Sequence, residues 1–492
     1  MSACRAEYTS CVYMYVIGAM ATRSVSKPLI IFLAFVFCGG SLAIHQGGKR
    51  YGVTGNSSSV PLPTADVLAW TQREIGAFFS FNMITMLTNV SNTQYFCIGV
   101  GGSIADLPHP DVFNPEALAV NEWLATASSL GAKYAVLTAQ HCSGFSMWPT
   151  NIYDETGFNY TYSTRYSSFR GGGYDIVEDF VHYCRQFGIK PGLYYSLNQN
   201  YYLNVGHGVV QKTLHPGQVN VSQELYGKIV LAQMRELWTK YGELSEIWFD
   251  GGCSVPGISD EINSMLKELQ PHAVYFGGCA GQNNIRWVGT ESGVPNYPIW
   301  STADNCAAGQ GTATGNVFCP AETDTTLQQS DHWFWRPNFP IRSLEELQEV
   351  YYHSVGQNTN LLLNMPANSS GQIEFSYHER YSDFGSWISK CFGSAVAETS
   401  GTGYSLNLST STSFLFNKMV ISEDQSQGEA VLEFAVSALL VNGSKMEILS
   451  GQAVGHKYVR DIGSTVNATE VVLDVSKSFY KPVFSKFSIH YC

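Results

Sequence analysis

An aspartate ends a short apolar segment and is followed by two glycines. The segment reads Glu246-Ile247-Trp248-Phe249-Asp250-Gly251-Gly252. Because side chains alternate along a strand, Trp248 and Asp250 are expected on one face, with Ile247 and Phe249 on the other. A carboxylate beside an indole ring suits attack on the anomeric carbon of a sugar whose apolar face lies against the indole. The same residues also fit an ordinary Asp-Gly turn.

A second segment joins an apolar run to a polar and aromatic loop. It extends from Tyr134 to Trp148 and carries His141 directly after Gln140. The imidazole of His141 can bind hydroxyl groups, although a single histidine also fits ordinary packing and hydrogen bonding. A metal centre fits less well, because Cys142 is adjacent to His141 and no second compact His/Cys pair stands at ligand spacing. We therefore expect no metal ion and no organic cofactor.

Between Leu68 and Met365, short apolar runs alternate with amphipathic stretches of helical periodicity. Repeated units of this kind predict a parallel sheet covered by helices. No Gly-x-Gly-x-x-Gly turn follows the first strand, so an α/β fold of the (β/α)8-type TIM barrel fits better than a dinucleotide-binding sheet. Active sites of such barrels lie at the carboxyl ends of the strands, where we expect His141, Asp250 and the Tyr194-Tyr195-Ser196 run. The expected strands and helices span residues 77–81, 122–130, 134–139, 174–187, 192–197, 224–241, 246–249, 260–269, 274–277, 344–355 and 360–364.

The residues after Cys391 follow a different pattern. Apolar and polar residues alternate in six short segments without helical periodicity, which predicts a small all-β sandwich. Such a domain can bind sugar, but packing against the barrel is its simpler role. We expect a linker over residues 44–67, a catalytic barrel over 68–391 and the C-terminal β-sandwich over 392–492. The six segments span residues 404–408, 414–421, 430–440, 445–448, 471–475 and 484–491.

Motifs along the chain resemble those of the α-L-fucosidases of glycoside hydrolase family 29, in the same order. The run from Val136 to Trp148 is similar to the Leu-Thr-x-Lys-His-His-Asp-Gly-Phe-x-Leu-Trp signature of that family. The resemblance extends from about Leu68 to the end of the chain. Further similar runs lie at residues 192–196, 241–251, 333–335 and 354–366, and beyond the barrel at 420–428 and 454–457.

The resemblance implies a retaining glycosidase that uses two carboxylates and acts on fucosylated glycans of glycoproteins or on oligosaccharides. The nucleophile of the family falls on Asp250. In the branch that acts on α-1,3/1,4-linked fucose, the acid/base lies in a Trp-x-Gly-Asn-Glu-x-Gly motif. That motif resembles residues 287–293 and places the acid/base on Glu291, for which a solvated loop residue is the alternative. The residues implied to bind the sugar are His141, Trp148, Tyr195 and Trp248.

The chain departs from the family pattern at several positions. Ser80 stands where the family has a sugar-binding histidine, Gln140 replaces a lysine, and Cys142-Ser143 replace His-Asp. A lost hydroxyl-binding group costs about 1–3 kcal/mol of affinity. Two alternatives therefore stay open beside the hydrolase. One is a secreted pseudoenzyme that binds fucose without cutting it, and the weaker one is a metal-dependent barrel hydrolase that a chelator would inactivate.

The amino-terminal residues predict export from the cell. Arg23 and Lys27 precede an apolar run that small residues follow up to Ala43, which is typical of a secretory signal over residues 1–43, with Met20 as an alternative start. The apolar run is shorter than the roughly 20 residues that span a membrane, so we expect no stable membrane anchor. The expected location is extracellular or lysosomal.

Cysteines, glycosylation sequons and net charge agree with export. Of twelve cysteines, Cys4, Cys11 and Cys38 fall in the signal segment, so nine remain and at least one stays unpaired. Spacing favours a bridge between Cys306 and Cys319. The 28 basic and 40 acidic residues give a net charge of −12, which disfavours binding to nucleic acid because both molecules are negatively charged. Asn-x-Ser/Thr sequons, typical of a glycoprotein, occur at Asn56, Asn89, Asn159, Asn220, Asn368, Asn407, Asn442 and Asn467.

Overall fold

The computed structural model describes residues 52–53, 60–87, 107–279, 281–329 and 332–492. The expected signal segment, most of the expected linker, Cys97 and the sequons at Asn56 and Asn89 lie outside these residues. In the described part of the chain, no helix combines the length and apolar character that crossing a bilayer requires.

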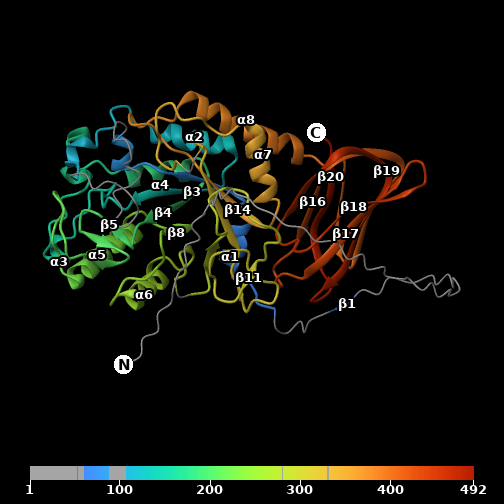
Figure 1. Cartoon of the computed structure of the whole chain (residues 1–492), viewed down its shortest axis with the longest axis horizontal. Helices are drawn as coiled ribbons and strands as arrows, with labels where there is room; N and C mark the ends of the chain where they lie inside the picture. The colour runs from blue at the N-terminus through green and yellow to red at the C-terminus, as the bar shows by residue number, and fades with distance from the viewer. Residues whose placement is uncertain (1–51, 54–59, 88–106, 280, 330–331) are drawn as a thin grey trace, which may run out of the picture. The chain divides into compact units, whose positions relative to one another are not determined.

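Eight parallel strands close into a barrel, which confirms the expected (β/α)8 architecture. Their order around the barrel is β10-β13-β14-β2-β3-β4-β8-β9. Six of them coincide with apolar runs expected from the sequence, and Figure 1 shows several of these among the surrounding helices. The six are β2 (Ile75–Phe79), β3 (Tyr134–Gln140), β4 (Lys190–Tyr195), β8 (Glu246–Phe249), β9 (Val274–Phe276) and β14 (Thr359–Asn364).

The other two barrel strands were not expected from the sequence. They are β10 (Asn284–Trp287) and β13 (Ala321–Thr325), and they read Asn-Ile-Arg-Trp and Ala-Glu-Thr-Asp-Thr. Neither contains an apolar run. In β10, polar Asn284 and Arg286 alternate with the inward Ile285 and Trp287, whereas in β13 the inward positions carry the carboxyl groups of Glu322 and Asp324. All five residues of β13 are nevertheless buried. Strand β13 pairs with β14 over Ala321–Thr325, so it is a full member of the barrel.

Helices cover the outside of the barrel. Four of them begin at side-chain caps. Asp175 accepts the backbone N–H of Glu178, Ser343 forms a capping box with Glu346, and Thr64 and Ser222 accept the backbone N–H groups of Val67 and Leu225. The cap at Asp175 explains why the helix that was expected from residue 174 starts at Ile176. The helices are α1 (Ala65–Thr71), α2 (Val120–Leu130), α3 (Tyr153–Thr156), α4 (Ile176–Gln186), α5 (Gln223–Lys240), α6 (Ser259–Leu269), α7 (Leu344–His353) and α8 (Phe375–Phe392).

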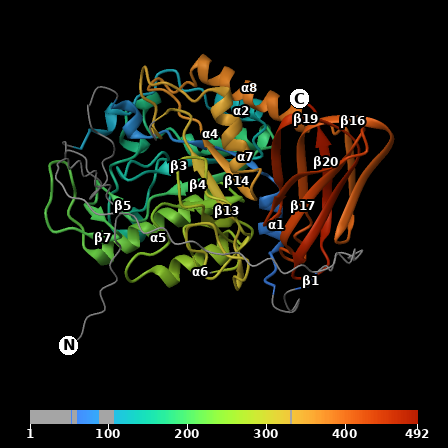
Figure 2. The ribbon, with the colours of Figure 1, turned by 45° about the vertical axis from the view of Figure 1, so that its right-hand side comes forward.

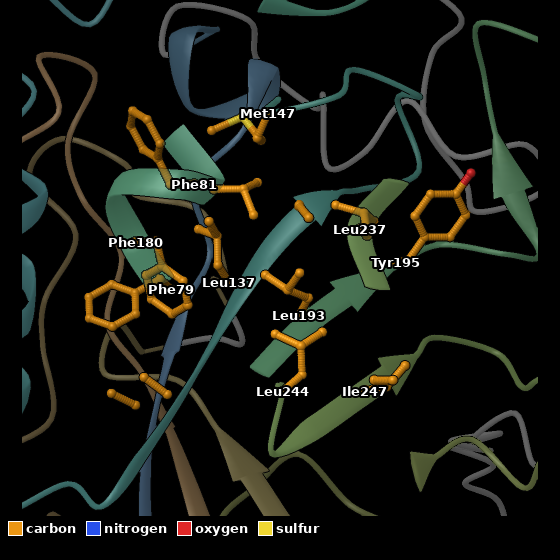
Figure 3. Close-up of a cluster of buried hydrophobic side chains, with 14 of the residues drawn as sticks. Phe79, Phe81, Leu137, Met147, Phe180, Leu193, Tyr195, Leu237, Leu244 and Ile247 are labelled. Atoms are coloured by element: carbon orange, nitrogen blue, oxygen red, sulfur yellow. The ribbon is translucent and has the colours of Figure 1, made fainter. Parts of the chain in front are cut away.

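The main hydrophobic core fills the layer between the barrel and these helices. Outward-facing side chains of neighbouring strands meet helix side chains there, and Figure 3 shows Leu137, Leu193 and Ile247 together with Phe180 of α4 and Leu237 of α5. A second, smaller cluster fills the barrel itself and is largely aromatic. Its members include Trp70, Phe78, Tyr134, Tyr194, Trp248 and Phe276.

The carboxyl-terminal residues form the expected all-β domain, drawn in orange and red in Figure 2. Hydrogen bonds join its strands into one sheet in the order β15-β20-β16-β19-β17-β18, and the short β1 (Gly52–Val53) pairs with β19. The expected segments 404–408 and 414–421 belong to one long strand that passes through register shifts. The strands are β15 (Ala397–Thr402), β16 (Ser405–Glu423), β17 (Val431–Leu440), β18 (Lys445–Gly451), β19 (Tyr458–Ser478) and β20 (Val483–His490).

Short strands occur in the loops of the barrel. They form a three-stranded sheet of β5 (Gln199–Asn200), β6 (Val205–Gly206) and β7 (Val209–Val210), and a pair of β11 (Thr302–Ala303) and β12 (Val317–Phe318).

Ionic and covalent links join the β domain to the barrel. Glu74, just before β2, forms ion pairs with Lys457 and, at 3.0 Å, with His456. Burial alone would raise the pKa of Glu74, but Lys457 and the hydrogen bond with His456 lower it to about 2. The disulfide Cys391–Cys492 connects α8 to the last residue of the chain.

The other cysteines agree with the expectation that at least one of the nine stays unpaired. The expected bridge Cys306–Cys319 is present, and Cys253 pairs with Cys279. Cys142 is disulfide-bonded as well. Among the described residues, Cys184 is the free thiol, and it is buried on the inner face of α4.

Candidate active site

Asp250 lies one residue beyond β8, at the carboxyl ends of the barrel strands. The alternation expected for this strand is confirmed: Trp248 faces the barrel interior, whereas Ile247 and Phe249 pack in the helix layer. The hydroxyl of Tyr194, at the end of β4, donates a hydrogen bond of 2.8 Å to Oδ2 of Asp250. Asp250 therefore stands at the mouth of the barrel, where it is exposed to solvent.

The surroundings of Asp250 have two opposing effects on the pKa of its carboxyl group. Desolvation by the surrounding protein raises the pKa of the carboxyl, while the hydrogen bonds from Tyr194 and from the Gly251 backbone lower it. Asp250 is thus surrounded by protein on the barrel side and open to water on the other. A hydroxyl that donates to one carboxylate oxygen leaves the other oxygen available to a substrate, as a nucleophile requires.

The two glycines after Asp250 form a tight turn. Gly251 has a φ of +73°, and a Cβ added there would lie 2.8 Å from the amide nitrogen of Asn198. The Asn198 amide also donates to the Gly251 carbonyl. Two residues later, the disulfide between Cys253 and Cys279 ties this turn to the loop after β9. The Asp-Gly turn therefore fixes the position of the Asp250 carboxylate at the mouth.

Aromatic rings form the floor of the mouth. Trp248 stacks on Phe276 with centroids 3.8 Å apart and on Tyr194 at 5.3 Å. Phe78 of β2 lies 5.5 Å from Trp248. Trp248 is buried, and its indole N–H donates to Glu322 deeper in the barrel at 3.1 Å. This floor offers an apolar surface to one face of a sugar ring.

His141 reaches the mouth because of an irregularity in β3. The register with β4 shifts between Thr138 and Gln140, so that Gln140 lies beside Tyr195 on the outer face and His141 turns inward. The imidazole stacks on Tyr194 with centroids 5.5 Å apart. Burial lowers the pKa of His141 to about 3, so the ring is neutral and able both to donate and to accept a hydrogen bond.

Glu291 approaches the same floor from another direction. It lies in the loop after β10, and the indole N–H of Trp333 donates to its Oε2 at 3.3 Å. The ring of Trp333 lies 5.6 Å from Phe78, which is itself 6.0 Å from Tyr194. Phe78 therefore contacts both the ring that binds Glu291 and the ring that binds Asp250.

The structure does not bring Trp148 and Tyr195 to the mouth. Trp148 is 1% exposed, and its indole donates to Glu236 of α5 at 2.8 Å. Tyr195 is 3% exposed and donates to Gln233 of α5 at 2.7 Å. Figure 3 shows Tyr195 in the helix layer with the outward side chains of the strands. The expectation that these two residues contact substrate is therefore corrected, since Tyr194 occupies the inward position on β4.

The departures from the family pattern lie in different surroundings. Ser80 directly follows β2 and, by alternation, shares the inward face with Phe78. The histidine that the family has at this position is therefore missing from the mouth. Gln140 points away from the mouth and donates to Ser146 at 2.9 Å in the helix layer. Ser143 is buried and donates to Asn82 at 3.1 Å. The replacement of the family's lysine by Gln140 therefore removes no side chain from the mouth.

Several residues at the mouth were missed by the sequence reasoning. They are Phe334, whose ring lies 4.8 Å from His141, and Trp287 and Asp324, which hydrogen-bond to each other at 2.7 Å. Trp287 was named only as part of a motif, and the strand that carries Asp324 was not expected. The alternation of Thr323 and Thr325 with carboxyl residues was the available signal, since β-branched residues favour strands.

Within the described ranges, no group of three or more His, Cys, Asp or Glu residues is arranged to hold a metal ion.

Comparison with known proteins agrees with this geometry. The sequence profile of the Alpha-L-fucosidase family matches residues 70–391. The chain belongs to the alpha-L-fucosidase family. It is 26% identical over 481 residues to "Alpha-L-fucosidase 1" of Arabidopsis thaliana, with 88% of each chain covered. It is 31% identical over 347 residues to "Putative alpha-L-fucosidase 1" of Oryza sativa subsp. japonica, covering 66% of this chain and 60% of that protein.

A solved structure extends the agreement to three dimensions. The structure of a "putative alpha-L-fucosidase" from Bacteroides thetaiotaomicron is similar with a TM-score of 0.80 and 28% sequence identity, covering 88% of this chain and 100% of that one. The family that the motifs resembled is thus confirmed, and with it the enzyme class: this alpha-L-fucosidase is a glycoside hydrolase.

Proposed function

We propose that this alpha-L-fucosidase is a retaining enzyme in which Asp250 is the nucleophile and Glu291 the acid/base. The observation that carries the proposal is the arrangement around Phe78. Tyr194, which binds Asp250, and Trp333, which binds Glu291, both contact this ring. A sugar on the aromatic floor would then have one carboxyl at its anomeric carbon and the other at its leaving oxygen.

The reaction follows in two displacements. In the first, ionised Asp250 attacks the anomeric carbon while Glu291 gives its proton to the leaving oxygen, forming a fucosyl ester and a free alcohol. In the second, water attacks the ester, Glu291 accepts a proton from that water, and Asp250 is released as a carboxylate. Double displacement calls for carboxyl groups about 5–5.5 Å apart. Neutral His141 is placed to bind a sugar hydroxyl.

The proposed substrate is a glycan with terminal α-linked L-fucose, in α-1,3/1,4 linkage. The linkage rests on the resemblance of residues 287–293 to the acid/base motif of that branch. Fucose carries a methyl group in place of a hydroxymethyl group, so an apolar floor of Phe78, Trp248 and Phe276 suits it. No metal ion or organic cofactor takes part in the proposed chemistry.

The proposed location is outside the cell or in the lysosome. Disulfides persist in oxidising compartments, and the structure has three between described cysteines. Sequon asparagines on the surface are available to carry glycans, and Asn159, Asn220, Asn407, Asn442 and Asn467 are all exposed. Asn368 differs, because it is half-buried and its side chain accepts the backbone N–H groups of Ser370 and Gln372.

The test is release of fucose from an α-1,3/1,4-fucosylated trisaccharide and from 4-nitrophenyl α-L-fucoside, with and without a chelator. We expect Asp250→Ala to lose about 10⁴-fold or more in kcat, as removal of a nucleophile does. Glu291→Ala should lose about 10²–10⁴-fold on the trisaccharide. It should lose less on the nitrophenyl fucoside, whose leaving group needs no proton. The control is Asp260→Ala, since Asp260 is exposed on α6.

Two results would contradict the proposal. The product anomer formed first, followed by NMR, should be α-L-fucose, and β-L-fucose would exclude retention. A folded wild-type protein that binds fucose but releases none from either substrate would favour the pseudoenzyme instead, with Ser80 as the position where a catalytic contact is missing. Loss of activity on chelation would indicate a metal-dependent hydrolase.

A further inference from the structure

Strand β13 directs two carboxyl side chains into the barrel that the proposed mechanism does not use. Glu322 is fully buried and Asp324 is 3% exposed. Both share the inward face of the strand, with Asp324 nearer the mouth. Burying a carboxyl group costs free energy unless hydrogen bonds and neighbouring groups compensate for the lost water. The contacts of Asp324 therefore indicate what this residue does.

Asp324 fixes the side chain that begins the loop of Glu291. Its Oδ1 accepts the indole N–H of Trp287 at 2.7 Å. Trp287 is the last residue of β10 and packs against the aromatic cluster in the barrel. The following residue of β13, Thr325, donates its hydroxyl to the backbone carbonyl of Glu291 at 2.6 Å. The end of β13 thus holds both the beginning of the loop and the backbone of Glu291.

The charges around Asp324 are mostly negative. Burial raises the pKa of Asp324, the charge of Glu291 raises it further, the Trp287 hydrogen bond lowers it, and Glu322 raises it again. The charge of Glu246 on β8 raises the pKa of Glu322 in turn. The positive charge of Arg73 acts in the opposite direction on Glu246 and lowers its pKa.

Other groups near Asp324 do not alter this balance. Tyr134 of β3 donates a hydrogen bond to Glu322 at 2.7 Å. The neighbouring strand β14 reads Thr-Asn-Leu-Leu-Leu-Asn and carries no titratable side chain. Arg342 binds Thr325 at 3.1 Å through the hydroxyl of that residue, on the outer face of the strand. The carboxyl that acts on Asp324 from the mouth is therefore Glu291.

We propose that Asp324 is a positioning residue of the active site: it orients Trp287 at the start of the Glu291 loop, and its negative charge increases the proton affinity of Glu291. This inference rests on the proposed function, because it takes Glu291 as the acid. Two interacting carboxyls lose their protons in two steps that belong to the pair. The second step, in which both become charged, is disfavoured and moves to higher pH. Asp324 neither gains nor loses a proton over the reaction, since Glu291 donates one in the first displacement and recovers one in the second.

The variant Asp324→Asn separates the two effects. An amide oxygen can still accept the Trp287 N–H, but an amide cannot ionise. Glu291 then titrates alone, so the high-pH limb of the kcat/KM profile should move down by about one pH unit, the coupling at which two groups titrate as a pair. The low-pH limb, which reports Asp250, should stay in place. The control is Thr323→Val, on the outer face of the same strand, where its hydroxyl lies 2.9 Å from that of Thr359.

A second variant tests the same interaction while keeping the Asp324 carboxyl. Trp287→Phe removes the hydrogen bond that favours ionised Asp324, so Asp324 carries less charge beside Glu291 and the high-pH limb should also move down, by less than in Asp324→Asn. This variant decides the question if Asp324→Asn does not fold. The proposal is overturned if the high-pH limb of Asp324→Asn coincides with that of the wild type, or if Trp287→Phe moves this limb up. An inactive wild-type enzyme would refute the proposed function instead, whereas an active wild type with unmoved limbs would refute this inference alone.

Discussion

Removing the hydroxyl of Tyr194 tests the assignment of Asp250 most directly. Tyr194→Phe keeps the ring that stacks on His141 and Trp248 but deletes the hydrogen bond of 2.8 Å to Oδ2 of Asp250. A hydrogen bond to a charged group is worth about 1.5–3 kcal/mol, and one pKa unit corresponds to about 1.4 kcal/mol. The loss therefore raises the pKa of Asp250 by about one to two units, with the lower figure expected because Asp250 is open to solvent.

The sign of the effect follows from the role of Asp250. The nucleophile must be ionised, so activity appears as the pH rises through its pKa. A raised pKa moves the low-pH limb of the kcat/KM profile upward by about one unit and leaves the high-pH limb in place. The assay is hydrolysis of 4-nitrophenyl α-L-fucoside from pH 3 to 9, with the product measured after quenching in base.

The adjacent tyrosine supplies a matched control. Tyr195→Phe makes the same chemical change one residue along β4 but removes a hydrogen bond to Gln233 in the helix layer. It should lower stability slightly and leave both limbs of the profile unchanged. If the low-pH limb moves equally in both variants, or in neither, the placement of Asp250 as an ionised nucleophile beside Tyr194 is refuted.

Two further predictions concern stability. Burial raises the pKa of Glu246 to about 7 beside Glu322, so this pair contributes stability at acid pH that is lost as the pH rises from about 4.5 to 7. Glu246→Gln should therefore raise the melting temperature relative to wild type at pH 8 and not at pH 4, and equal shifts at both would refute the reasoning. Glu74 has a lowered pKa, so its ion pair with Lys457 contributes stability above about pH 4.5 that is lost as the pH falls to about 2. Glu74→Gln should cost roughly 3 kcal/mol at pH 7 in urea unfolding and much less at pH 3, and a cost independent of pH would contradict the assigned ion pair.

The sequence predicted the barrel well where its strands are apolar. Strands such as β3 and β4 have outward side chains that pack on helices and read as hydrophobic runs. Strand β13 reads Ala-Glu-Thr-Asp-Thr, because two of its inward positions carry carboxyl groups near the catalytic end. These carboxyl groups break the apolar pattern on which strand recognition depends, so Asp324 was missed together with its strand.

The candidate site was predicted in part for a similar reason. Alternation along β8 placed Asp250 and Trp248 correctly, since Ile247 and Phe249 fixed which face was outward. The two tyrosines of β4 were not distinguished, because Tyr194 and Tyr195 are alike and only the register with β3 shows which faces inward. That register depends on an irregularity before Gln140, which local sequence does not reveal. Glu291 belongs to a loop whose path depends on contacts with β13.

The disulfide at the end of the chain gives the β domain an unusual topology. Cys391 and Cys492 lie 101 residues apart, so nearly the whole domain is a closed ring attached to α8 at one point. A single proteolytic cut within the ring leaves both pieces covalently attached, and the cut becomes visible on a gel only after reduction. Pulling on the two chain ends would not extend the ring, so a force experiment on the oxidised protein should unfold the barrel without lengthening the domain behind it.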